Sequence, residues 1–164
     1  MDFKQTLLNI VSNPSFQPPE NFMDLDLTSL KTILEGCGKK ICVKFAIGEA
    51  RLVLPIFEEA CPKDNRPRKA IETAELWFSN SDDTCTGSVF LNASAARAAA
   101  ANSNSYAAYD AADAAYASAD AACYAASAAA AACYAACYAR AAAADINLED
   151  QLMRLFKLMS NNDE

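Results

Sequence analysis

The sequence of 164 residues contains no histidine. Histidine is the commonest general base, proton shuttle and metal ligand near neutral pH, so its absence removes the usual centre of a hydrolase or a metal site. The chain also lacks a glycine-rich phosphate loop and any short spacing of a nucleophile with a base. These absences argue against an enzyme, and the sequence gives no reason to expect a cofactor or a metal ion.

Glycine and proline are scarce as well, with four and six residues respectively. Few turns can be built from so few chain breakers, which indicates long helices. The length fits one domain with a real core. We therefore predict an all-α fold, a single-domain helical bundle over residues 1–164 with large side chains in its N-terminal half.

Large apolar side chains are missing from residues 92–145, where Leu, Ile, Val, Phe, Met and Trp do not occur, and 31 of the 52 residues at 93–144 are alanine. Alanine is the best helix former. One straight helix of this length would measure about 80 Å, too long for a compact chain of this size. We expect breaks at residues 102–105 and near Ser118, giving two or three closely packed alanine-rich helices. A membrane span is not expected, because spanning helices need the larger apolar residues.

Concentrated charge is also absent. The net charge of −7 is spread as −2, −1, −1 and −3 over residues 1–60, 61–92, 93–144 and 145–164. An acidic chain does not favour a nucleic-acid partner, and no segment has the dense acidic rows of a DNA mimic. The first residues carry no apolar leader segment. Seven cysteines, an odd number, fit free thiols in a reducing cytosol.

Apolar periodicity predicts the helices outside the alanine-rich region. The 40–61 segment is apolar around most of its circumference, so we expect it to be central, with a kink at Pro55. Asp64 or Asn65 is the cap candidate of the next helix, Ser88 that of a helix with Val89, and Asn147 that of an amphipathic C-terminal helix. The predicted helices comprise residues 3–11, about 26–35, 40–61, a segment after 64 that ends near 78, a segment after 88, and 147–159.

Tyr109, Asp113, Tyr116 and Asp120 are spaced four, three and four residues apart, so they share one helix face. Tyrosine joins a large contact area to a hydroxyl and is enriched in binding hot spots. This pattern predicts a partner-binding surface. The alternative is that the tyrosines fill gaps between alanines and bond their hydroxyls to aspartates of neighbouring helices.

Two further clusters have competing interpretations. Cys133 and Cys137, with Cys123 expected on the same helix, are either a thiolate metal site or buried apolar residues, and the ligand set is incomplete for a metal. Arg66, Arg68 and Lys69 place positive charge at a helix start, where the helix dipole opposes it. Either Glu58 and Glu59 compensate this charge, or an acidic patch of a partner does.

The run Leu54-Pro55-Ile56-Phe57-Glu58-Glu59 and the block Asp64-Asn65-Arg66-Pro67-Arg68-Lys69-Ala70-Ile71-Glu72, followed by Trp77 and the alanine-rich half, resemble the immunity proteins of bacterial polymorphic toxin systems. More specifically, the chain looks like the immunity-protein-five-like domain over about residues 40–144. That family usually has histidines in its alanine-rich half, where this chain has tyrosines and cysteines.

The resemblance implies a non-catalytic protein that neutralises a protein partner in the bacterial cytosol. Arg66, Arg68, Lys69, Tyr109, Asp113, Tyr116 and Asp120 are the predicted partner-binding residues. The alternative is a phage-encoded inhibitor of a host defence system, such as an anti-CRISPR protein in the host cytosol. Self-association into a homo-oligomer is left open by the sequence.

Overall fold

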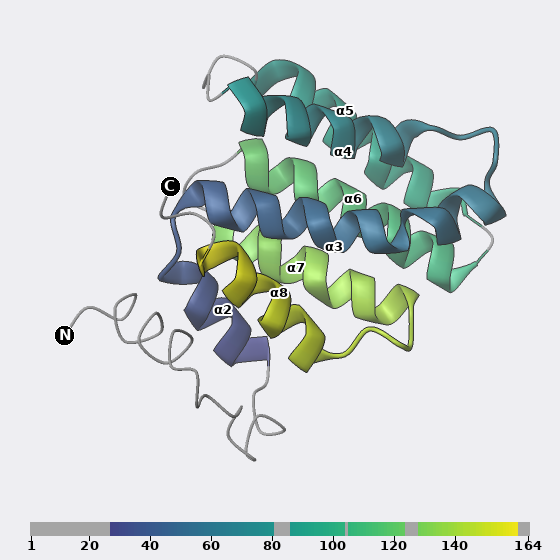
Figure 1. The fold of residues 1–164 in the computed structure, drawn as a ribbon. Coiled ribbons are helices and arrows are strands. Elements are labelled where there is room, and N and C mark those ends of the chain that lie inside the picture. Colours follow the sequence, from purple (N-terminus) through teal and green to yellow (C-terminus); the bar gives the residue numbers. More distant parts are fainter. Residues whose placement is uncertain (1–26, 81–85, 104, 124–127, 161–164) are drawn as a thin grey trace.

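The computed structural model describes residues 27–80, 86–103, 105–123 and 128–160, which form seven α-helices and no strand (Figure 1). The prediction of an all-α fold is confirmed. The predicted helix at residues 3–11 lies outside the described residues. In chain order the helices are α2 (Leu27–Glu35), α3 (Lys39–Ala60), α4 (Arg66–Asn80), α5 (Thr86–Ala101), α6 (Tyr106–Cys123), α7 (Ala128–Ala142) and α8 (Leu148–Ser160).

The helices are stacked in antiparallel succession (Figure 1). Helices α4 and α5 lie at the top of the view, α3 and α6 cross the middle, and α7, α8 and α2 lie below them. The α3–α4 turn, the α5–α6 turn and the α7–α8 connection consequently gather at one end of the bundle, on the right of the view. The two sequence regions that were singled out for binding therefore begin at the same end.

The centre of the bundle is α6 rather than α3. Helix α6 packs against α3, α4, α5 and α7, and nine of its alanines are buried. Helix α3 contributes large core residues such as Phe45 and Phe57, but Leu52 on the same helix is 48% exposed. The expectation that 40–61 is wrapped by the other helices holds in part, because α3 packs against α4, α6, α7 and α8 but leaves the face with Leu52 exposed. The helix continues through Pro55 without interruption.

The alanine-rich region forms three helices, α5, α6 and α7, as predicted. The first break falls at residues 102–105, as expected, since α5 ends at Ala101 and α6 begins at Tyr106. The expected break near Ser118 was wrong. Ser118 is fully buried inside α6, and its hydroxyl donates a hydrogen bond of 2.8 Å to the carbonyl of Ala115. A serine that bonds within its own helix does not have to end it.

Helix starts agree with the cap predictions in two of three cases. The backbone N–H of Asp150 donates to the Asn147 side chain at 2.9 Å. At the start of α4, the Asp64 carboxylate accepts the N–H of Arg66 at 3.1 Å. Ser88 is not a cap, because α5 already begins at Thr86.

A buried carboxylate ties three helices together. Glu49 of α3 is fully buried and accepts hydrogen bonds from Arg154 of α8 at 2.7 and 3.0 Å. The Gln151 amide donates to Glu49 at 2.7 Å and to the carbonyl of Ala136 in α7 at 2.8 Å. This cluster holds α8 against α3 and α7, next to the apolar contacts of Leu152 and Leu155.

Candidate functional site: a tyrosine–aspartate cleft

A cleft of about 220 Å³ opens between α5, α6 and α7, and we call it the tyrosine–aspartate cleft. Alanines at its floor leave room between the helices, so the larger residues form the walls. Of the four residues predicted on one face of α6, the cleft contains three. Its lining consists of Arg97 from α5, Asp113, Tyr116, Ala117 and Asp120 from α6, and Ala131, Tyr134 and Tyr138 from α7.

Asp113 is the most unusual residue of the cleft. It is only 5% exposed, and its Oδ1 atom has no hydrogen-bond partner among the residues that the structure describes. A buried carboxylate oxygen without a partner is costly, because it has lost its hydration and gained nothing in return. Oδ1 itself is closed to solvent, so a donor that enters the cleft reaches it only after the neighbouring wall side chains move apart.

Aromatic rings line the remaining walls. The guanidinium carbon of Arg97 lies 5.3 Å from the centre of the Tyr116 ring, within cation–π distance. Tyr134 and Tyr138 are one turn apart on α7, with ring centres 6.5 Å apart and planes tilted by 31°. The cleft thus combines two carboxylates, one guanidinium and three phenol rings.

Exposed tyrosines lie in the cleft and beside it. Tyr109 is 42% exposed and Tyr134 is 59% exposed, whereas Tyr116 and Tyr138 are partly buried against the core. Tyr106 is 92% exposed, and it lines with Tyr109 a neighbouring hollow of about 390 Å³ at the α5–α6 turn. The alternative that tyrosines fill gaps between alanines therefore fits Tyr116 and Tyr138. It does not fit Tyr106, Tyr109 and Tyr134, whose rings are exposed to solvent.

Burial governs the acid–base behaviour of the cleft. It raises the pKa of Asp113 above its usual value, although the charge of Arg97 and a hydrogen bond from Tyr109 oppose the shift. Burial likewise raises the pKa of Asp120, again against the charge of Arg97. It also raises the pKa of the Tyr138 hydroxyl, so this tyrosine stays protonated at neutral pH.

Replacing Asp113 by Asn is expected to raise the free energy of unfolding by about 1 kcal/mol at neutral pH, since it removes an incompletely paired buried charge. A carboxyl whose pKa is higher in the folded state binds more protons there, so its stabilising contribution falls as pH rises above its unfolded pKa. The stability difference between Asp113→Asn and wild type should therefore grow from pH 4 to pH 7. Urea unfolding at several pH values measures this stability difference. An Asp113→Asn variant that is less stable than wild type at pH 7 contradicts the description of Asp113 as an incompletely paired buried charge.

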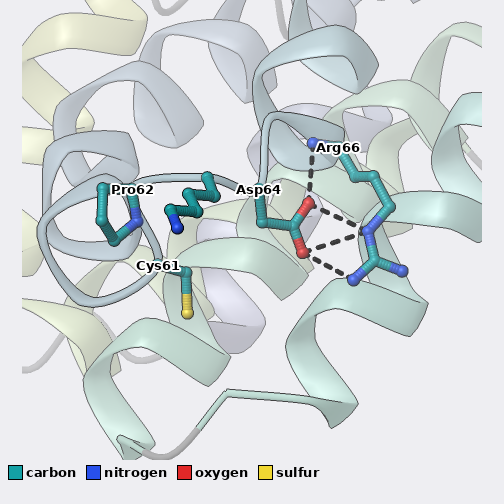
Figure 2. A pocket seen from close by; sticks show the side chains of 5 residues that line it. Cys61, Pro62, Asp64 and Arg66 are labelled. Carbon is teal, nitrogen blue, oxygen red and sulfur yellow. Dashed lines mark hydrogen bonds and ion pairs between the residues drawn. The ribbon is translucent and has the colours of Figure 1, made fainter.

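The basic block at the start of α4 is neutralised within the chain. Arg68 donates two hydrogen bonds to Glu58, both of 2.7 Å. Arg66 turns back onto Asp64, with its Nε atom 2.9 Å from Oδ1 (Figure 2). Internal pairing was the favoured interpretation, and it holds for both arginines, although Asp64 rather than Glu59 is the second acid. Lys69 is exposed and pairs with no carboxylate in the described part of the chain.

A hollow of about 550 Å³ lies beside the α3–α4 turn and is lined by Cys61, Pro62, Lys63, Asp64 and Arg66 (Figure 2). An active site at this turn would need Arg66, Arg68 and Glu72 to converge in a deep pocket. Arg68 instead points to Glu58 on α3, and neither Arg68 nor Glu72 lines the hollow. The hollow has an ion pair in its wall and no convergent set of reactive groups.

The cysteines do not assemble into one cluster. Cys123 ends α6, whereas Cys133 and Cys137 belong to α7, so the expected sharing of one helix was wrong. No group of three metal-ligating side chains forms among the described residues. The neighbouring thiol of Cys133 and the positive charge of Arg140 lower the pKa of the Cys137 thiol below its usual value. None of the six described cysteines, including the buried Cys42, forms a disulfide with another described residue, and Cys85 lies outside the described residues.

Three cleft residues were missed from the sequence: Arg97, Tyr134 and Tyr138. They lie on helices whose packing partners periodicity alone does not reveal. One signal was present, since Arg97 and Arg140 are the only basic residues between 93 and 144. An isolated charge in an alanine-rich helix must point to solvent or to an acid, and the nearest acids were already marked on α6. Whether the marked residues bind a partner stays a prediction.

Comparison with known proteins identifies a family for the chain. The family described as "Imm-5 like putative immunity protein" matches residues 33–158, which extends the expected region of about 40–144 at both ends and includes all of the cleft. No curated protein and no solved structure matches the chain. None of the described helices combines the length and apolarity that crossing a membrane requires.

Proposed function

The chain belongs to the Imm-5 like family of immunity proteins, and from this premise we propose that it is an inhibitory binding protein that neutralises a protein toxin. In this proposal it acts without catalysis, by covering a functional surface of the toxin. The observation that carries the proposal is the tyrosine–aspartate cleft, an open site with exposed tyrosines around a buried, incompletely paired carboxylate.

The surface around the cleft has the composition of a protein-binding hot spot. Tyr106, Tyr109 and Tyr134 are large, exposed and carried on helices, so they lose little conformational freedom on binding. The alanines beneath them provide a rigid base because their side chains have no rotamers to order. In a soluble monomer, large exposed aromatic residues that gather on one surface favour a partner.

The basic block has a secondary role in this proposal. The donor groups of Arg66 and Arg68 already face Asp64 and Glu58, so a partner carboxylate would have to displace an internal one. The charge of Lys69 can meet a partner carboxylate without displacing an internal one. We propose that Lys69 and the two arginines steer the partner, whereas the cleft provides most of the affinity.

Affinity capture from the native host, followed by mass spectrometry, tests the proposed function. The wild-type chain should retain a protein that Tyr109→Ala plus Tyr134→Ala loses, because both side chains are exposed and their removal should leave the fold intact. Leu91→Ala is the matched control, as Leu91 is a large residue of α5, 69% exposed, that does not line the cleft.

Equal capture by the double variant would show that the cleft is not the binding surface. The captured protein also decides between two classes of partner. A toxin encoded beside this chain supports immunity, whereas a component of a bacterial defence system supports the phage-encoded alternative and contradicts the toxin assignment.

A further inference from the structure

The charge of the cleft selects the kind of group that fits it. Asp113 and Asp120 contribute two carboxylates and Arg97 one guanidinium, which leaves one net negative charge in the lining. Arg97 lies over the Tyr116 ring and forms no ion pair with a described carboxylate. The negative charge of the cleft is therefore only partly compensated, and a cation from outside is the complementary ligand.

Asp113 adds an independent observation. The residue is 95% buried, its Oδ1 atom lacks a partner in the described part of the chain, and it forms part of the cleft wall. A buried acceptor in this state gains a partner if a ligand in the cleft displaces the covering side chains and brings an N–H donor to it. The protein bears this cost in its free form, which is expected of a site whose donor arrives with a ligand.

The aromatic walls distinguish between cations. Tyr116, Tyr134 and Tyr138 line the same space, and aromatic rings favour a planar cation that can stack on them. A guanidinium is planar, weakly hydrated and able to donate two parallel hydrogen bonds to one carboxylate. An ammonium group is compact and strongly hydrated, so it loses more on entering a cleft of about 220 Å³.

We propose that the tyrosine–aspartate cleft receives an arginine side chain of the protein partner, with the guanidinium on Asp113 and between the tyrosine rings. This inference rests on the proposed function for the origin of the arginine, although the cleft chemistry can be tested without the partner. Inserting one arginine would both anchor the complex and supply the donor that the Oδ1 atom of Asp113 lacks.

The test uses the full chain and N-acetyl-L-arginine amide as the probe, followed by NMR of the tyrosine rings. N-acetyl-L-citrulline amide is the matched neutral probe, since it has almost the same shape without the charge. The arginine probe should shift the Tyr116, Tyr134 and Tyr138 signals with a dissociation constant on the order of millimolar. The citrulline probe should bind at least about tenfold more weakly, because it lacks the charge that the cleft attracts.

Variants with opposite expected effects on arginine binding sharpen the test. Asp113→Asn should weaken arginine binding at least about tenfold, and Asp120→Asn should weaken it less, since Asp120 is less buried. Arg97→Gln should strengthen binding a few fold, because it removes a like charge from the lining. Lys157→Gln, at an exposed position of α8 that does not line the cleft, should leave it unchanged.

Three results would overturn the inference: equal binding of citrulline and arginine, no effect of either aspartate variant, or weaker binding in Arg97→Gln. Binding of inorganic phosphate that is lost in Arg97→Gln would assign the cleft to an anion instead. The two proposals can fail separately. Arginine binding without partner capture contradicts the proposed function alone, whereas tyrosine-dependent capture without arginine binding contradicts only the cleft chemistry.

Discussion

Replacing Glu49 by Ala should lower the free energy of unfolding by about 3 kcal/mol, the lower end of the range for breaking a buried ion pair. Glu49 is fully buried, and its loss would leave Arg154 and the Gln151 amide without their shared acceptor. The lower end applies because the Arg154 side chain is 35% exposed and can regain water. Chemical denaturation of the variant measures the effect.

The control for Glu49 is another glutamate of α3. Glu58 pairs with Arg68 at the surface, where both side chains are partly exposed, so Glu58→Ala should cost less than about 1 kcal/mol. The double variant Glu49→Leu plus Arg154→Leu should recover much of the loss, because apolar residues of similar size can replace a buried pair. If Glu49→Ala costs no more than Glu58→Ala, the Glu49 cluster does not hold α8 in place.

Enlarging an alanine at the centre of the bundle should have the second large effect. Ala115 of α6 is fully buried, and α6 contacts four other helices. Ala115→Leu has to force α6 away from its neighbours, which should lower the free energy of unfolding by about 3 kcal/mol. Thermal and denaturant unfolding of the variant measure the loss.

Ala98 provides the comparison for Ala115, because it lies on the alanine-rich helix α5 but is exposed. Ala98→Leu keeps a good helix former at a solvent-facing position and should change stability by less than about 0.5 kcal/mol. A similar cost for both leucine variants would mean that close packing of small side chains is not what stabilises α6.

Helix content and helix ends followed well from local sequence. Asn147 and Asp64 act as caps because capping depends on a few neighbouring residues. The break at residues 102–105 was equally local. Ser118 was misjudged because its hydroxyl bonds inside the helix, and the choice between bonding inside and outside a helix depends on what packs against it.

The arrangement of helices was harder to predict. A pattern of large apolar residues marks α3 as a core helix. The buried residues of α6 are almost all alanines, so the sequence does not reveal which neighbours they pack against, although α6 packs against four other helices. Glu49 and Arg154 are 105 residues apart, so no periodicity connects them. The sequence predicted only the cleft residues of α6, because Arg97 and Tyr134 line the cleft from two other helices.

The most direct test of the account is a titration of the captured partner's toxic activity with purified protein. We predict that wild-type protein abolishes the activity at one equivalent, whereas Tyr109→Ala plus Tyr134→Ala requires at least about 100-fold more, as expected for the loss of two hot-spot residues. Partner activity that persists at saturating wild-type protein, or equal inhibition by the double variant, would contradict inhibition through the tyrosine–aspartate cleft.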